Sequence, residues 1–216
     1  EFRNETIPGL FQTLKELNIP YQYVPTEKLN RITGKNHQGI IALLSEVEYT
    51  DLDKLVPGLF ESGKTPSIVV LDGITDVRNI GAIARSAECA GFDALVIPSK
   101  GSAQINSEAI KSSAGALNTI PVCRVNSLPD AVKFLHDSGF YIAAATEKAE
   151  KTLFQADFKN PVVVIMGSED TGIDTRLLKM ADILVKIPML GTIQSLNVSA
   201  AASVVFFEIV RQRMND

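Results

Sequence analysis

The stretch PVVVIMGSEDTGI, residues 161–173, carries the plainest structural signal in this chain. It opens with a continuous apolar run rich in β-branched residues, which is typical of a strand covered on both faces of a parallel sheet. The run breaks into a polar turn in which Gly167 and Gly172 bracket Glu169. Glycines permit close backbone approach, and open α/β sheets bind ligands at the carboxyl ends of their strands. An ordinary turn with Asp174 capping a helix explains the same residues equally well.

Similar apolar runs occur on both sides of this stretch and alternate with segments of helical spacing. The runs are SIVVL (67–71), ALVIP (94–98), PVCRV (121–125), YIAAA (141–145) and DILVKIP (182–188). The helical segments are residues 79–91, 106–117, 128–139 and the long final segment 196–213. Since parallel neighbours need crossover connections, the alternation predicts an α/β fold in which helices flank both faces of a parallel sheet.

The N-terminal part of the chain has a different pattern. It offers one helix candidate, IPGLFQTLKELN (7–18), then YQYV and a polar stretch that ends in HQGIIALL (37–44). So short a segment makes a thin core for an independent domain. We therefore predict a partial, small α/β accessory domain over residues 1–49, a linker over 50–66 and the main domain over 67–216.

Residues 58–65 read GLFESGKT and match the consensus sequence of a phosphate-loop motif. A phosphate loop follows a strand and opens a helix, whose free N–H groups hold the phosphates. Here Pro66 disfavours helical geometry at Thr65, and the next element is a predicted strand. We therefore reject nucleotide triphosphate binding at this segment.

Composition excludes several classes of protein. The chain has 21 basic and 25 acidic residues, a net charge of −4 and a pI near 5.3, which excludes a broadly cationic nucleic-acid surface. Its apolar runs are far short of the ~18 residues that span a bilayer. The opening EFRNE has no initiator methionine and none of the features of a secretion signal, so we interpret it as a trimmed start. Two cysteines, Cys89 and Cys123, predict neither a disulfide framework nor a metal site, and favour a cytoplasmic location.

Two further regions hold candidate functional side chains. Asn79 stands where a helix is predicted to begin and could simply cap it. Arg85 follows on the same helix, and the small residues Gly81 and Ala82 lie four and three positions before it, which we expect to leave the guanidinium a clear path toward the helix start. A solvated surface role for Arg85 is the alternative.

The second region is IPMLGTIQSLNVSAAASVVFF, residues 187–207. Ser195 and Asn197 stand where the last helix begins, and either could cap it. Every residue of that helix from Val198 to Val205 is small or apolar, which is typical of a helix buried between layers or at a subunit contact.

Taken in order, NIGAIARSA, VVIMGSEDTGI and IPMLGTIQSLNVSAAAS resemble the three signature motifs of the SpoU (TrmH-like) branch of the SPOUT RNA 2′-O-ribose methyltransferases. The resemblance covers residues 67–213. HQGIIAL also resembles the junction between the two domains of the RlmB-like ribosomal RNA enzymes, which carry an N-terminal RNA-binding domain. One departure is Asp170, which stands where the family usually has glycine.

The resemblance implies a C-terminal deep trefoil knot, a homodimer, and the cofactor S-adenosylmethionine. By motif position it implies eight cofactor-binding residues: Thr146, Gly167, Ser168, Glu169, Ile187, Met189, Ser195 and Leu196. It implies five catalytic or supporting residues: Asn79, Arg85, Glu169, Ser195 and Asn197.

The implied reaction is S-adenosylmethionine-dependent 2′-O-methylation of a ribose in structured RNA, with ribosomal RNA favoured over transfer RNA. A guanidinium keeps its proton in proteins, so we expect Arg85 to stabilise developing negative charge on the attacking oxygen. Because the chain is acidic, RNA binding needs local cations, for which Arg78, Arg85, Lys111 and Arg124 are candidates. The rival hypothesis is a noncatalytic RNA-binding or ribosome-assembly factor. No G-x-G-x-x-G follows the first strand, which argues against a dinucleotide oxidoreductase.

Overall fold

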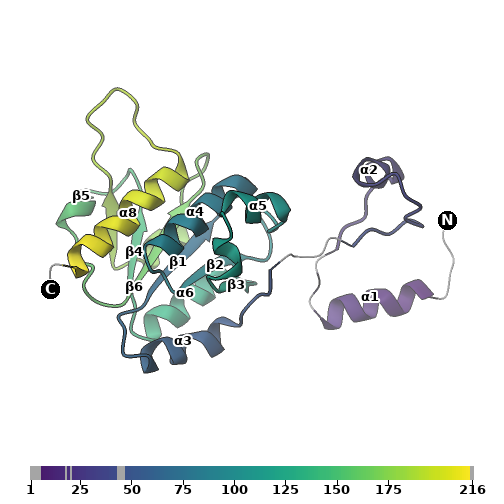
Figure 1. Cartoon of the computed structure of the whole chain (residues 1–216), viewed down its shortest axis with the longest axis horizontal. Coiled ribbons are helices and arrows are strands. Elements are labelled where there is room, and N and C mark those ends of the chain that lie inside the picture. Colours follow the sequence, from purple (N-terminus) through teal and green to yellow (C-terminus); the bar gives the residue numbers. More distant parts are fainter. Residues whose placement is uncertain (1–5, 18, 20, 43–46, 215–216) are drawn as a thin grey trace. The chain divides into compact units, whose positions relative to one another are not determined.

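The computed structural model describes residues 6–17, 19, 21–42 and 47–214. The chain divides into two compact units, Glu1–Leu44 and Ser45–Asp216 (Figure 1). The following description takes each unit by itself.

The N-terminal unit contains helices α1 (Thr6–Glu16) and α2 (Thr26–Ile32). The Phe11 ring on α1 packs against Tyr21 and Tyr23, with ring centroids 5.1 Å and 5.6 Å apart. Within residues 6–17, 19 and 21–42 there is no strand, so the β part of the predicted α/β accessory domain is not formed there. The aromatic side chains of YQYV pack on a helix, and a strand needs a neighbouring strand to be stable. The junction motif HQGIIAL ends at residue 43, which lies outside the described residues.

The second unit is built on a parallel sheet of seven strands in the order β3-β2-β1-β6-β4-β7-β5. All six strand pairings are parallel. The strands are β1 (Ser67–Asp72), β2 (Ala94–Pro98), β3 (Val122–Val125), β4 (Tyr141–Ala145), β5 (Lys151–Thr152), β6 (Val162–Gly167) and β7 (Ile183–Lys186). The apolar runs of the sequence thus form the strands, which confirms the parallel α/β fold.

Helices cover both faces of this sheet (Figure 1). On one face lie α4 (Val77–Cys89), α5 (Ser107–Ser112), the short 3-10 helix η1 (Ala116–Asn118) and α8 (Val198–Arg213). On the other lie α3 (Leu52–Glu61), α6 (Leu128–Asp137) and α7 (Thr175–Met180). A second 3-10 turn, η2 (Leu153–Gln155), follows β5. Strand β1 supplies both layers: Val69 and Leu71 belong to the first core, and Ile68 and Val70 to the second. This is the alternation of side chains that a strand imposes.

Part of the expected linker is helical. Residues 52–61 form α3, whose Leu52 and Val56 are buried in the second core and whose Phe60 ring lies 5.2 Å from that of Phe140. The physical reason is the spacing of Leu52, Leu55, Val56 and Leu59, which places apolar side chains on one face of a helix. Helix α3 comes before the GKT segment, and strand β1 comes after it. The segment that matches the phosphate-loop consensus therefore lacks the strand–loop–helix order of a true phosphate loop, as predicted.

The last helix is only partly enclosed within the chain itself. Val205, Phe206 and Ile209 on α8 are buried, but the Val204 and Phe207 side chains are 37% and 50% exposed. Among the described residues no helix is both long and apolar enough to pass through a membrane.

The strand order determines where a site can form. All carboxyl ends of the strands lie at one edge because the strands are parallel, and β6 lies between β1 and β4. The loops that follow β1, β4, β6 and β7 therefore emerge close together, although they are far apart in the sequence. The loop between β7 and α8 projects from this edge at the top of Figure 1, where Leu190 is 99% exposed.

Candidate active site

A pocket of about 280 Å³ lies at this edge and is lined by the loops that follow β4, β6 and β7. All eight residues predicted to bind the cofactor line it: Thr146, Gly167, Ser168, Glu169, Ile187, Met189, Ser195 and Leu196. Asn197 also lines it. The structure therefore gathers loops that are far apart in the sequence into one hollow.

Gly167 holds the β6 turn in shape. A Cβ atom at this position would lie 2.3 Å from the carbonyl carbon of Gly172 and 2.5 Å from the backbone nitrogen of Ile173. Such contacts are far inside van der Waals distance. Glycine is required here because the turn folds back on the end of β6, where Gly172 N donates to the Ser168 carbonyl at 3.0 Å.

Further bonds fix the same turn at its two ends. The Thr171 backbone N–H donates to Ser168 Oγ at 3.1 Å, and the two hydroxyls lie 2.8 Å apart. At the far end the Asp174 N–H donates to Asp72 Oδ2 at 2.7 Å, which joins the turn to the end of β1. Asp174 in turn caps α7, as one of the two sequence readings proposed. Its hydrogen bonds from Arg176 lower the pKa of the Asp174 carboxyl to about 2.

Three polar side chains form a network at the rim of the pocket. Asn197 Nδ2 donates to Glu169 Oε1 at 2.6 Å and to Asn79 Oδ1 at 3.1 Å. Asn79 Nδ2 donates to the same Glu169 oxygen at 3.3 Å, and so does the Val198 N–H at 3.3 Å. One carboxylate oxygen thus accepts bonds from the start of α4 and the start of α8.

The two asparagines differ in how they relate to their helices. Asn197 caps α8, since its Oδ1 accepts from Ser199 N at 3.0 Å, and it joins the network through its amide nitrogen. Asn79 does not cap α4: the helix begins at Val77, and Asp76 is the cap. The physical reason is that Asp76 satisfies the free N–H of Arg78 at 2.8 Å, which extends the helix by a half-turn and releases the Asn79 side chain for the network.

Arg85 lies elsewhere on α4. It is exposed and is not among the residues that line the pocket. The expected clear path beside Gly81 is filled, because a Cβ atom there would lie 2.5 Å from the Ala109 carbonyl oxygen and 2.7 Å from Ser112 Cβ. The small size of Gly81 serves the close packing of α5 on α4. Ser195 lines the pocket in the loop before Asn197.

The four candidate RNA-binding cations do not all gather at one place. The Arg124 guanidinium donates to the Ser99 carbonyl at 3.1 Å and lies 5.4 Å from the centre of the Tyr49 ring, so it is committed to the fold. Arg78 lies 3.5 Å from Asp76 and 3.7 Å from Glu108, with its side chain largely exposed. These contacts link the start of α4 to α5.

The pocket has polar residues that the motif positions did not identify. Glu147, Lys186 and Gln194 line it beside the predicted set. Glu147 had a signal in the sequence, because it comes two residues after the end of an apolar strand run, where ligand-binding residues gather. Within the described residues there is no cluster of three or more acidic, histidine or cysteine side chains that would hold a metal ion.

The model of the SpoU rRNA methylase family matches residues 66–207, and a model described as RNA 2′-O ribose methyltransferase substrate binding matches residues 2–50. This chain belongs to the SpoU rRNA methylase family.

Relatives within the SpoU family match most of the chain. The 23S rRNA (guanosine-2′-O-)-methyltransferase RlmB of Yersinia pestis is 39% identical over 85% of this chain and 74% of its own length. RlmB of Photorhabdus laumondii is 37% identical over 94% of this chain and 84% of its own. A TrmH-family protein of Staphylococcus haemolyticus is 32% identical over 98% of this chain and 85% of its own.

Solved structures of the SpoU family share the fold. The SpoU methyltransferase AviRb of Streptomyces viridochromogenes, in complex with AdoMet, aligns with a TM-score of 0.70 and 28% identity. The alignment covers 78% of this chain and 67% of AviRb. The chain is thus a methyltransferase of the SpoU family by sequence and by fold.

Proposed function

We propose that this protein transfers a methyl group from S-adenosylmethionine to the 2′-hydroxyl of a ribose in structured RNA, and that this RNA is ribosomal. The observation that most supports this proposal is the Asn79–Glu169–Asn197 network at the rim of a pocket formed by three separate loops. The RlmB relatives, named as 23S rRNA methyltransferases, support ribosomal RNA over transfer RNA. No observation favours the noncatalytic assembly factor.

The pocket suits this donor in chemistry. S-Adenosylmethionine carries a sulfonium and an ammonium group, and the carboxylates of Glu147 and Glu169 line the pocket. Its adenosine can pack on apolar side chains such as those of Ile187 and Leu196. A volume of about 280 Å³ is close to the lower end of ligand sites, ~300 Å³. We assign donor binding to the eight residues predicted from the motifs.

The bound donor supplies an electrophilic methyl group, and the residues of this chain must position and activate the ribose hydroxyl. We assign the orientation of the hydroxyl to Asn79, whose amide is held by Glu169 and Asn197. Glu169 therefore orients Asn79 through the hydrogen bond that it accepts. Ser195 lies in the loop that precedes this network and supports its position.

Arg85 approaches the reaction from the substrate side in this proposal. It lies six residues after Asn79, on the outer surface of α4. RNA bound over α4 brings a phosphate and the attacking oxygen to the guanidinium, which stabilises the negative charge that develops as the hydroxyl loses its proton. The phosphate is the acceptor that we propose for this proton.

The remaining assignments concern organisation. We propose that residues 1–49 bind RNA, residues 50–66 connect the two parts and residues 67–216 form the knotted catalytic domain. The substrate-binding family model over residues 2–50 supports the first of these. The exposed apolar side chains of Val204 and Phe207 on α8 support a homodimer, which sedimentation would detect as twice the mass of one chain. The cytoplasmic location stays a prediction from the cysteine content.

The test is ribose-methylation mapping. Unmodified 23S ribosomal RNA, made by transcription in vitro, is incubated with the protein and isotope-labelled S-adenosylmethionine, and the digested nucleosides are identified by mass spectrometry. We expect one 2′-O-methylated nucleoside. Label on a base, or no transfer despite donor binding, would refute the proposal.

A further inference from the structure

We propose that a hollow on α5 binds the phosphate backbone of the substrate RNA beside the methylated ribose. This α5 hollow is lined by Ser107, Glu108, Lys111 and Ser112. It is separate from the donor pocket, with which it shares no lining residue. The inference rests on the proposed function, because it names the path that the same RNA substrate takes across the surface.

Helix geometry places two arginines on one ridge of α4. Arg78 and Arg85 are seven residues apart on α4, which is nearly two full turns, so they share one ridge with a rise of ~10.5 Å between them. Gly81 lies three positions after Arg78 and four before Arg85, and is therefore on the neighbouring part of the helix surface. Asn79 and Ser86 lie on the opposite flank, where Ser86 Oγ is 2.7 Å from Ser203 Oγ on α8.

Close packing connects that ridge to α5. A Cβ atom on Gly81 would lie 2.7 Å from Ser112 Cβ, so α4 packs directly against the Ser112 end of the α5 hollow. Arg78 reaches the other end of the hollow, with its Nε atom 3.7 Å from Glu108 Oε1. Two cations, Arg78 and Lys111, thus accompany two serine hydroxyls on this surface of α5.

This combination suits a phosphate chain. Guanidinium and ammonium groups with hydroxyl donors are the contacts that proteins make to nucleic-acid backbones. The chain as a whole carries a net charge of −4, so its RNA affinity depends on local groups of this kind. Asn79 lies on one flank of α4, and α5 with its hollow packs against the other flank. RNA that crosses α4 can therefore present a ribose to the donor pocket and the adjoining phosphates to α5.

Glu108 allows a test in which a substitution should strengthen RNA binding. It lines the hollow and lies 3.7 Å from Arg78, so it both repels phosphate and competes for the arginine. The contact joins two exposed side chains, and such pairs are weak enough for a phosphate to displace. Removal of this charge by Glu108→Gln should therefore strengthen RNA binding.

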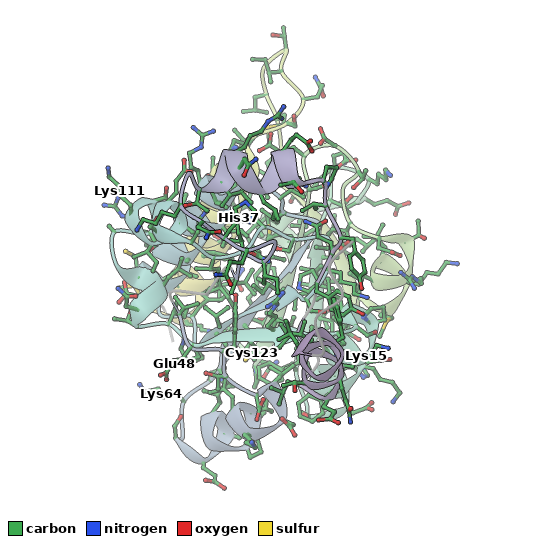
Figure 2. The ribbon with its side chains drawn as sticks, turned by 90° about the vertical axis from the view of Figure 1, so that its right-hand side faces the viewer. Lys15, His37, Glu48, Lys64, Lys111 and Cys123 are labelled. Atoms are coloured by element: carbon green, nitrogen blue, oxygen red, sulfur yellow. The ribbon has the colours of Figure 1, made fainter. Side chains whose placement is uncertain are left out.

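The experiment measures binding of the full chain to transcribed 23S ribosomal RNA by filter retention over a series of KCl concentrations. The variants are Lys111→Ala, Arg78→Ala and Glu108→Gln. The matched control is Lys64→Ala, which removes the same charge from an exposed lysine that lies well away from Lys111 (Figure 2). Affinity for S-adenosylhomocysteine, measured by calorimetry, reports whether the donor pocket is intact in each variant.

We expect Lys111→Ala and Arg78→Ala each to weaken RNA binding several-fold and to reduce the slope of log affinity against log salt by ~0.7. The KM for RNA should rise by the same factor, with donor affinity unchanged. Glu108→Gln should tighten binding, and Lys64→Ala should behave as wild type. If Lys111→Ala and Lys64→Ala give the same slope and affinity while wild type methylates the transcript, the α5 site is wrong and the proposed function stands. If wild type methylates no ribose, the proposed function itself fails.

Discussion

The amide nitrogen of Asn197 lies 2.6 Å from Oε1 of Glu169. This contact joins the loop after β6 to the first turn of α8, and the same carboxylate oxygen accepts from Asn79 on α4. Three segments that are distant in the sequence are thus held together by one oxygen atom at the rim of the pocket.

The first prediction concerns that oxygen. Glu169→Ala removes the acceptor of three donors, so Asn79 loses its orientation, and we expect single-turnover methylation to fall by ~100-fold or more. Glu169→Gln keeps an amide oxygen that can accept from Asn197 and should lose less. Equal rates for Glu169→Ala and wild type, with RNA and donor both saturating, would show that the network does not support catalysis.

The second prediction concerns Gly167. Gly167→Ala forces the turn away from the end of β6, because its Cβ atom would lie 2.3 Å from Gly172 C. We expect affinity for S-adenosylhomocysteine, measured by calorimetry, to fall at least ~10-fold, since ligand sites need sub-ångström placement. Gly58→Ala is the matched control, because that glycine lies within α3 with no atom within 4 Å of the added Cβ. The control should keep full affinity and gain up to ~1 kcal/mol of helix stability.

The strands and most of the pocket could be predicted from the sequence, but the packing between helices could not. Continuous apolar runs identify strands that are buried on both faces, and Gly167 marks a turn at the end of one. The environment of Gly81 depends on α5, which docks there from about 30 residues away, so no local pattern reveals that the space beside Arg85 is occupied. Helix α3 was missed for a different reason: Pro57 and Gly58 interrupt an otherwise helical spacing of apolar residues.

The third prediction concerns the two cysteines. Cys123 is fully buried in β3, and burial raises the pKa of its thiol to about 11, so it has almost no thiolate near neutral pH. Cys89 is exposed at the end of α4. Iodoacetamide should therefore add one label to the folded chain and two labels after unfolding, as read by intact mass. A native Cys89→Ser variant that still takes up label would contradict this assignment.

The fourth prediction concerns the end of α8. The half-buried Arg213 guanidinium donates to the carbonyl oxygens of Phe158, Thr65 and Asn160 and to Ser67 Oγ, at 2.8 to 2.9 Å. Arg213→Ala leaves these acceptors without their donor, and we expect the free energy of unfolding to fall by ~2–4 kcal/mol in urea titrations. Lys64→Ala, which removes an exposed charge, should leave it unchanged. If Arg213→Ala lowers the free energy of unfolding no more than Lys64→Ala does, α8 is held by its apolar face alone.

The central claim is that loops after β4, β6 and β7 form one donor site whose reactive end faces the Asn79–Glu169–Asn197 network. A crystal structure with bound S-adenosylhomocysteine tests it most directly. We predict that the ligand contacts all three loops, at Thr146, Gly167 and Leu196, and that its sulfur atom faces the side of the pocket where Glu169 and Asn197 lie. A ligand bound at any other place, or with its sulfur turned away from that network, would contradict the account.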